Sequence, residues 1–431
     1  MIKLLASIRF GPYFLTQFLG AFNDNLYKNA LIILITYSLA AKAQLNTDTL
    51  VNLSAGLFIL PYFLFSAFAG QLADKMEKSR YIRIIKITEI ILMCIGALAF
   101  LTKNINLLLF ILFCMGAQSS FFGPVKYGIL PQHLSKADLV NGNGLVEMGT
   151  FLAILLGTIT GGLMIGYESG IYLVAFAVIF FAALGWLAST KIPIAPAVDP
   201  DLKLNFNLIT ESVKIIRHIF TYRLVFLAII GISWFWFFGA IILAQFPAYT
   251  KNYLNANEEV VTLLLATFSL GIGLGSVFCG YYSRHTISRS LKMLPVGAFG
   301  LSLFGLTITL LEPTVIGTAT MGFNEFISSS GNLVIIAAFT AMSFSGGLFI
   351  VPLYTFIQHY APQNYRSRII AGNNILNALF MVIAAVSAIL FLNNIGTIVQ
   401  LFACLALMNV VIFICSFIFV TKYASQLHRY S

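Results

Sequence analysis

The sequence predicts an all-α polytopic membrane protein with twelve transmembrane helices in two pseudo-symmetric six-helix halves, with both termini in the cytoplasm. Composition is the first observation, because 59% of the 431 residues are hydrophobic and only 9% are charged. A soluble domain carries about 25% charged residues. The second observation is a series of long apolar runs, and the third is the placement of the basic residues.

Each transmembrane helix needs about 20 mainly apolar residues to cross the bilayer core. Runs of this length recur along the whole chain. We expect spans at about 12–40, 50–73, 81–102, 105–123, 139–164, 170–189, 223–247, 259–282, 293–311, 331–357, 369–393 and 396–421.

The basic residues indicate the orientation of these spans. If the N-terminus is cytoplasmic, 21 of the 25 Lys and Arg residues fall in inner segments, whereas the outer loops hold only Lys42, Lys103 and Lys251. This asymmetry follows the positive-inside rule and predicts cytoplasmic termini. The net charge of +10 therefore follows the membrane. Without a continuous basic patch on a soluble module, we expect no nucleic-acid partner.

The chain divides at its longest polar segment. We expect an N-terminal six-helix bundle at 1–190, a cytoplasmic linker at 191–222 and a C-terminal six-helix bundle at 223–431. Within the linker, LITESVKIIRHI has apolar residues at helical spacing, which predicts an amphipathic helix on the membrane surface.

Short polar segments repeat between the two halves. GQLADKMEKSR follows the second span and GYYSRHTISRS follows the eighth; PQHLSKADLVNGNG follows the fourth and PQNYRSRIIAGNN the tenth. Such internal repetition resembles the two halves of major facilitator transporters.

The segment from Gly70 to Arg80 also resembles the loop of that superfamily, with Gly, three residues, Asp and then basic residues. The resemblance implies a gate in which Asp74 contacts the end of a neighbouring helix. Acidic or carbonyl groups would pair with its basic residues, which are Lys75, Lys78 and Arg80. The family usually has Gly at the position of Glu77. The alternative is an ordinary positive-inside loop.

Four ionisable residues lie within predicted spans, all in the N-terminal half: Asp24, Lys28, Glu89 and Glu147. A charge at a lipid-facing helix centre costs about 2.5–3.5 kcal/mol, so we expect these side chains to face the protein interior.

The first span concentrates its polar residues on one side. At 100° per residue, one stripe contains Gln17, Gly20, Ala21, Asp24 and Lys28, with Asn25 and Asn29 beside it. We expect the opposite side, with Leu15, Leu19, Phe22, Leu26 and Ile33, to face lipid.

Asp24 and Lys28 are four residues apart with the acid first, the favourable order for a pair on one helix. Two interpretations stay open: a structural ion pair, or two groups that bind separate parts of a ligand.

Glu89 and Glu147 lie about nine residues from the cytoplasmic ends of their spans, or roughly 13 Å deep. Either acid is a candidate for binding a cationic group or a coupling proton, and Glu147 for pairing with Lys126. At the exit of the fourth span, Gly123 and Pro124 place Lys126 at phosphate depth. Lys126 is therefore a candidate for an anionic headgroup, or a snorkelling residue. Gln118, on the same span, is a further substrate-binding candidate.

One enzyme signal is present. His133 and Asp138 have the H-x4-D spacing of glycerophospholipid acyltransferases, but no second block of that family accompanies them. Ser135 and Asp138 also fit a helix N-cap with its capping box. We therefore predict no enzyme. All five histidines fall in predicted cytoplasmic segments, so we also predict no metal site and no cofactor.

Two strings carry a closer resemblance. TQFLGAFNDNLYKNALIILITY and FFGPVKYGILPQHL resemble the bacterial lysophospholipid transporter group of the major facilitator superfamily. That group includes domains fused to 2-acylglycerophosphoethanolamine acyltransferase and acyl-carrier-protein synthetase. The resemblance implies headgroup-binding roles for Asp24 and Lys126. Two departures are Gly123-Pro124-Val125-Lys126, where the group commonly has Ser-Pro-Ala-Lys, and Gln132 where an acid is common.

The resemblance implies a flippase of the bacterial inner membrane that moves lysophosphatidylethanolamine and lysophosphatidylglycerol from the outer to the inner leaflet, without ion coupling. Reacylation would need a separate acyltransferase and synthetase, since no such domain follows the spans. We expect a monomer surrounded by membrane lipids. The alternative is a proton-coupled exporter of a drug, siderophore or other small amphiphilic metabolite, with Asp24, Glu89 or Glu147 carrying protons.

Overall fold

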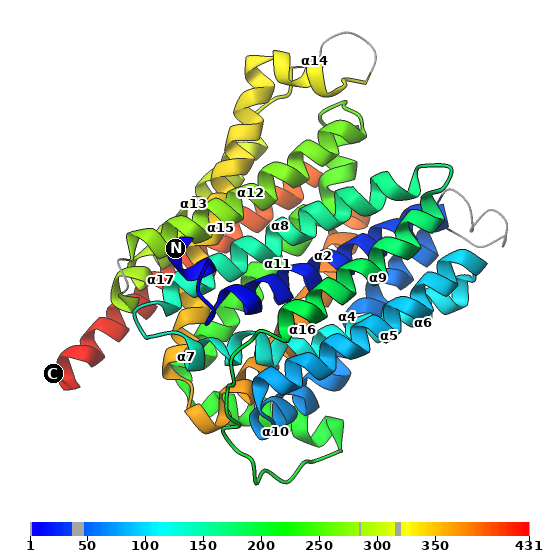
Figure 1. Ribbon diagram of the computed structural model, residues 1–431. Coiled ribbons are helices and arrows are strands. Elements are labelled where there is room, and N and C mark those ends of the chain that lie inside the picture. The colour runs from blue at the N-terminus through cyan, green and yellow to red at the C-terminus, as the bar shows by residue number, and fades with distance from the viewer. Residues whose placement is uncertain (1, 37–46, 284–285, 315–319, 431) are drawn as a thin grey trace. The chain divides into compact units, whose positions relative to one another are not determined.

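The computed structural model describes residues 2–36, 47–283, 286–314 and 320–430, and most of them are helical (Figure 1). The helices in order are α1 (Ile2–Leu5), α2 (Gly11–Leu34), α4 (Thr47–Lys75), α5 (Lys78–Thr102), α6 (Ile105–Gly128), α7 (Leu130–His133), α8 (Leu139–Ile165), α9 (Gly170–Ser189), α10 (Leu208–Thr221), α11 (Arg223–Asn252), α12 (Glu258–Tyr282), α13 (Ile287–Leu310), α14 (Phe323–Ser328), α15 (Ser330–Tyr360), the 3-10 helix η2 (Gln363–Tyr365), α16 (Arg366–Asn394) and α17 (Ile398–Tyr430).

Long helices occupy the positions of the predicted spans. Within the described ranges, eleven helices are long and apolar enough to cross a membrane. Helix α2 has 24 residues but contains the polar NDNLYKN segment and is not among the eleven. The all-α polytopic class is therefore confirmed. The count of twelve spans and the cytoplasmic termini stay predictions. Residues 37–40 of the first predicted span, and 284–285 of the repeated GYYSRHTISRS segment, lie outside the described residues.

The chain forms two compact units whose boundaries differ from those of the predicted halves. Unit 1 contains Met1–Ser135, Leu152–Arg223 and Gln358–Ala378, and unit 2 contains Lys136–Phe151, Leu224–Ile357 and Leu379–Ser431. The start of α16 thus belongs to unit 1 and the start of α8 to unit 2. The division into six helices plus six stays a prediction.

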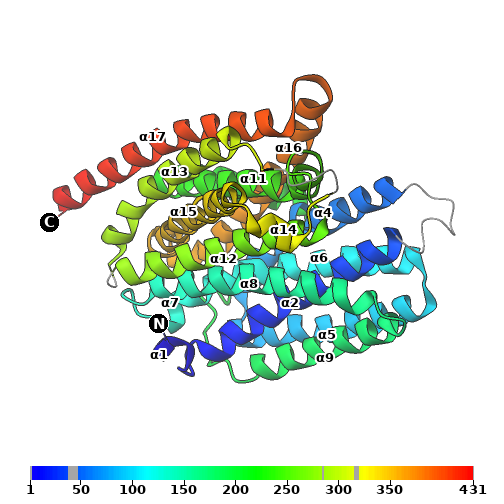
Figure 2. The ribbon, with the colours of Figure 1, turned by 90° about the horizontal axis from the view of Figure 1, so that it is seen from above.

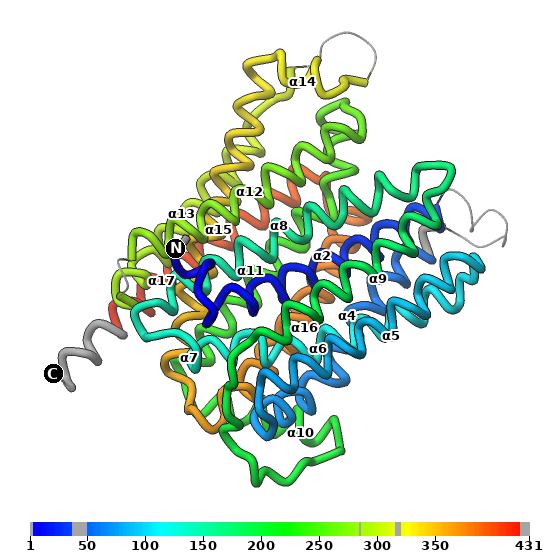
Figure 3. Tube along the Cα trace, viewed as in Figure 1, coloured from blue at the N-terminus to red at the C-terminus, as the bar shows by residue number. Residues whose placement is uncertain are grey.

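In unit 1, α4 packs on α6, α5 packs on α6 and α9, and α2 packs on α9 (Figures 1 and 2). Aromatic and aliphatic side chains fill the space between α2, α5 and α6. Tyr27 meets Phe100 edge-on with ring centroids 5.1 Å apart, and its hydroxyl donates to the Leu108 carbonyl at 3.0 Å. Between α9 and α10 the chain is extended (Figure 3).

The lipid-facing side expected for α2 is wrong for three of its five residues, whereas Leu15 is exposed and Ile33 is half-buried. Leu19, Phe22 and Leu26 are all buried, and the Phe22 ring contacts Phe181 of α9 at 4.6 Å. Gly157 and Gly161 of α8 also lie against the backbone of α2 on this side. The helical wheel identified the polar stripe, but it carries no information on how many neighbours surround a helix.

Small residues allow α16 to join unit 1. A Cβ at Gly70 of α4 would lie 2.7 Å from the Ala371 Cβ and 3.0 Å from the Arg368 Cα. Gly372 on α16 likewise leaves room for Ile215 and Ile219 of α10. Glycines permit such close helix approach in membranes.

A buried asparagine connects three helices of unit 2. Asn409 of α17 accepts the Trp234 indole N–H at 2.8 Å and donates to the Ala298 carbonyl at 2.7 Å and to Ser302 at 2.9 Å. Helices α13 and α17 run side by side (Figure 2). The start of α8 is held in unit 2 by a hydrogen bond that Asn143 donates to Thr355 of α15 at 3.1 Å.

We predict that Gly161→Ala lowers the thermal stability of the purified protein in detergent. The new methyl group would collide with the Leu26 carbonyl oxygen of α2, which cannot move as a side chain can. Gly239 on α11 is the matched control, because a Cβ there meets no atom within 4 Å. Gly239→Ala should keep or raise stability, by about 0.5–1 kcal/mol. Equal melting temperatures for the two variants would contradict the close α2–α8 packing.

Candidate functional site

Asp24 and Lys28 contact other helices rather than each other. The Asp24 carboxylate accepts the Ser119 hydroxyl of α6 at 2.7 Å, and the Lys28 Nζ lies 4.4 Å from the Phe58 ring centroid of α4, a cation–π geometry. Within the described ranges no ion pair joins the two residues. Both side chains are half-buried, so this arrangement favours separate roles over a structural pair.

A buried ion pair lies next to this acid. The Lys86 Nζ and the Glu89 Oε2 are 2.5 Å apart on α5, and both residues are at most 2% exposed. Glu89 also accepts Nε2 of Gln118 at 3.2 Å and Nδ2 of Asn23 at 3.4 Å. A buried pair is tolerated when further hydrogen bonds satisfy its charges, as they do here.

Lys86 is a residue that the sequence reasoning missed. The positive-inside pattern places Lys86 among the cytoplasmic basic residues, although Lys86 lies within the predicted 81–102 span. A Cβ at Gly20 of α2 would lie 2.5 Å from the Lys86 Nζ, and one at Gly185 of α9 would lie 3.4 Å away. The Lys-x-x-Glu spacing at 86–89 was the available signal.

These contacts form one continuous chain of polar side chains in unit 1. Ser119 Oγ lies 3.3 Å from Gln118 Oε1 as well as 2.7 Å from Asp24. We call Lys86, Glu89, Gln118, Ser119 and Asp24 the polar network. A hydroxyl has one proton, so Ser119 donates either to Asp24, which is the shorter contact, or to Gln118.

The remaining predicted binding residues are more dispersed. Asn25 donates to the Ala21 carbonyl of its own helix and Asn29 to the Thr158 carbonyl of α8, both at 2.7 Å. Lys126 is half-buried in unit 1, with its Nζ 5.2 Å from the Tyr127 ring centroid. Glu147 is fully buried, but it belongs to unit 2.

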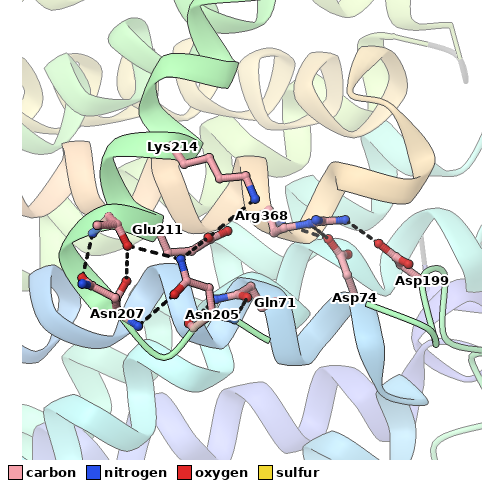
Figure 4. A network of polar contacts seen from close by, with 9 residues as sticks. Gln71, Asp74, Asp199, Asn205, Asn207, Glu211, Lys214 and Arg368 are labelled. Carbon is pink, nitrogen blue, oxygen red and sulfur yellow. Dashed lines mark hydrogen bonds and ion pairs between the residues drawn. The ribbon is translucent and has the colours of Figure 1, made fainter. Parts of the chain in front are cut away.

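Asp74 lies at the first turn of α16 (Figure 4). Its carboxylate is fully buried and accepts the backbone N–H groups of Ser367 at 3.2 Å and Arg368 at 3.4 Å, and Nε of Arg368 at 3.0 Å. Arg368 donates in turn to Asp199 at 2.9 Å and to the Asn364 carbonyl at 2.6 Å. An acid that caps the positive end of a helix dipole stabilises that end.

The basic residues of the loop differ in their contacts. Lys75 donates to the Leu202 carbonyl at 2.6 Å, and Lys78 donates to the Ala73 carbonyl at 2.9 Å. Arg80 is exposed, and its side chain forms no hydrogen bond or ion pair with the residues that the structure describes.

Glu77 has a structural role that accounts for its departure from the family pattern. It caps α5 by accepting the backbone N–H groups of Ser79 and Arg80 at 2.8 Å, and it accepts the Ala195 N–H of the linker at 2.7 Å. Burial raises the pKa of the Glu77 carboxyl, but these hydrogen bonds outweigh burial and leave the pKa below its usual value.

The two residues of the acyltransferase-like spacing differ in setting. His133 is buried at the end of α7 in unit 1. Asp138 belongs to unit 2, where its main-chain carbonyl accepts the Gly142 N–H at 2.8 Å at the start of α8.

The fold and the buried charges define the class of protein. Long apolar helices with ionisable residues turned into the protein are typical of membrane transporters. The model of the Major Facilitator Superfamily matches residues 13–385, and the chain belongs to that superfamily.

Curated bacterial relatives cover most of the chain. The lysophospholipid transporter LplT of Serratia proteamaculans (strain 568) is 27% identical over 372 residues, which is 83% of this chain and 81% of the relative. The LplT of Escherichia coli O1:K1 is 26% identical over 365 residues, with the same coverage of each. The chain is accordingly a multi-pass protein of the bacterial inner membrane.

Solved structures share the fold at low sequence identity. The human organic anion transporter MFSD10 (TETRAN) has a TM-score of 0.73 at 12% identity, with 94% of this chain and 98% of that chain covered. FucP in the outward conformation has a TM-score of 0.69 at 13% identity, with 96% and 99% covered.

We predict that the ion pair of the polar network is strongly coupled. Lys86→Met and Glu89→Met should each lower the free energy of unfolding by about 3–5 kcal/mol, because each leaves an unpaired buried charge. The double variant Lys86→Met/Glu89→Met should recover most of this loss. The measurement is a double-mutant cycle by thermal unfolding in detergent. Additive losses would show that the two charges are not coupled.

Proposed function

We propose that this protein transports lysophospholipids across the bacterial inner membrane. The observation that carries the proposal is the pair of half-buried, oppositely charged groups on α2, Asp24 and Lys28, which engage other helices instead of each other. A zwitterionic headgroup needs one acid and one base at separate positions. The name of the curated relatives, lysophospholipid transporter, supports this substrate class.

Each polar residue has a proposed role. Asp24 binds the ethanolamine ammonium, and Lys28 or Lys126 binds the phosphate as a point charge. Glu89 holds the Gln118 side chain, and Gln118 acts on Asp24 by competing with it for the Ser119 hydroxyl. Asn25, Asn29 and Glu147 are further candidates for the substrate path.

We propose transport by alternating access, with the contact between Asp74 and the first turn of α16 as a gate that opens and closes in each cycle. Gly70 allows the close approach, while Lys75 and Arg80 flank it. Transfer runs from the outer to the inner leaflet in a monomer. Reacylation is left to a separate acyltransferase and acyl-carrier-protein synthetase. The protein itself is not an enzyme, since His133 and Asp138 lack the remaining motif of an acyltransferase.

A proton-coupled exporter is the second candidate, and one observation bears on it. Glu89 forms an ion pair with Lys86, so its charge is balanced by a permanent partner. This pairing favours a structural role for Glu89, which leaves Asp24 and Glu147 as the acids for a coupled mechanism. Dependence of transport on a pH gradient separates the two candidates.

We predict that Asp24→Asn lowers transfer of labelled lysophosphatidylethanolamine about 10- to 150-fold, the loss expected for one charge-assisted hydrogen bond. The assay is leaflet transfer in proteoliposomes, with and without a pH gradient. Glu168→Gln, which changes an exposed acid between α8 and α9, is the matched control and should transfer normally. No transfer by the parent protein under either condition would overturn the proposed function, and transfer that requires the gradient would favour the exporter.

We also predict that Asp74→Asn opens the start of α16. The variant loses the charge that caps this turn and pairs with Arg368, so the transfer rate should fall. A cysteine introduced as Ser367→Cys, at a position 1% exposed, should become more reactive to a polar maleimide. Asp201→Asn, an exposed acid of the linker, is the control. Unchanged reactivity in Asp74→Asn would contradict the proposed gate.

A further inference from the structure

The apolar side of helix α10 is only partly covered by the rest of the protein. Ile215 and Ile219 are at most 1% exposed and pack on Gly372 of α16. Next to them around the helix lies a second apolar row with large exposed fractions: Ile209 at 78%, Val213 at 52% and Phe220 at 57%. At 100° per residue these three side chains lie within about 40° of one another.

The basic residues of α10 lie beside this exposed apolar row, and its acid lies on the buried side. Lys214 and Arg217 are exposed and follow the row around the helix. The one acid of the helix, Glu211, is 1% exposed and is occupied by Asn205 at 3.2 Å and Lys214 at 3.8 Å. The outward surface of α10 is therefore apolar and cationic, with its acid turned inward.

The buried side of α10 contacts the segments that surround Asp74 (Figure 4). Asn205, just before the helix, exchanges two hydrogen bonds with the Gln71 side chain of α4, at 2.8 and 3.1 Å. The His218 ring lies 4.2 Å from the ring of Tyr365, and Tyr365 lies 4.0 Å below the Arg368 guanidinium. A displacement of α10 would therefore reach both α4 and the start of α16.

We propose that α10 binds the anionic phospholipid surface of the cytoplasmic leaflet, and that this binding stabilises the contact between Asp74 and α16. Apolar side chains enter the headgroup boundary while Lys214 and Arg217 meet lipid phosphates, as in other interfacial helices. A soluble phosphate would bind the two cations but would leave the apolar row exposed to water. The lipid surface accommodates both, so it is the partner that we propose. The effect on the gate rests on the proposed function, whereas the lipid binding does not.

The lipid binding is tested on the full chain in nanodiscs, with native cysteines replaced and an environment-sensitive fluorophore at Val213→Cys. Emission should shift to shorter wavelength and be quenched by lipid-borne spin labels, more strongly when phosphatidylglycerol is added to phosphatidylcholine. Asp201→Cys, at an exposed position of the linker outside α10, is the control and should stay solvent-accessible. Inorganic phosphate should have no effect. A solvent-exposed fluorophore at Val213→Cys in both membranes would overturn the proposal.

The effect on the gate is tested with Lys214→Gln/Arg217→Gln. Adding phosphatidylglycerol should change the transfer rate of the parent protein, and each lost charge should weaken this effect about fivefold. Transfer in phosphatidylcholine alone should stay unchanged. Lys103→Gln/Lys191→Gln removes two other exposed charges and should respond like the parent. Lipid binding without any effect of phosphatidylglycerol on parental transfer would overturn the regulatory part alone. A parent that transfers no lysophospholipid would overturn the proposed function and that regulatory part together, and the fluorescence result would still decide the lipid binding.

Discussion

The carboxylate of Asp74 and the first turn of α16 form the contact on which the packing of α16 in unit 1 depends. A buried carboxylate and unpaired helix-start N–H groups would each be costly alone, and here they satisfy each other. Arg368 balances the charge and extends the contact to Asp199 of the linker. With α16 fixed in this way, Gly70 and Gly372 let α4 and α10 pack closely against it.

In the polar network, at another position in unit 1, buried charged groups again balance each other and are satisfied by hydrogen bonds. Lys86 balances Glu89, and amide side chains complete the hydrogen bonds of the pair. Asp24 differs, because it is half-buried and has one neutral donor, Ser119. The network thus contains a neutralised pair that supports structure and one acid that has no ion-pair partner among the described residues. This difference is the physical basis for the proposal that Asp24 binds the headgroup and that the pair of Lys86 and Glu89 is structural.

Much of the fold could be predicted from the sequence, since apolar runs locate helices and the internal charges of α2 stand out against them. The resemblance of Gly70–Arg80 to the loop of the superfamily also implied that Asp74 meets a helix end. Its partner Arg368 could not be identified, because 294 residues separate them and no local pattern joins them. Lys86 was missed because a base near the cytoplasmic end of a span usually snorkels. The burial of Leu19 depends on helix neighbours, which periodicity does not encode.

Distances between spin labels placed just after α4 and on η2, measured by pulsed electron paramagnetic resonance in nanodiscs, test the proposed gate most directly. Labels at Met76→Cys and Gln363→Cys, with native cysteines replaced, flank the contact between Asp74 and α16. Without substrate, we predict one short distance between the two labels. Lysophosphatidylethanolamine should add a population with a longer distance, and Asp74→Asn should produce the same longer distance without substrate. A single distance that neither the lipid nor Asp74→Asn changes would contradict the gate.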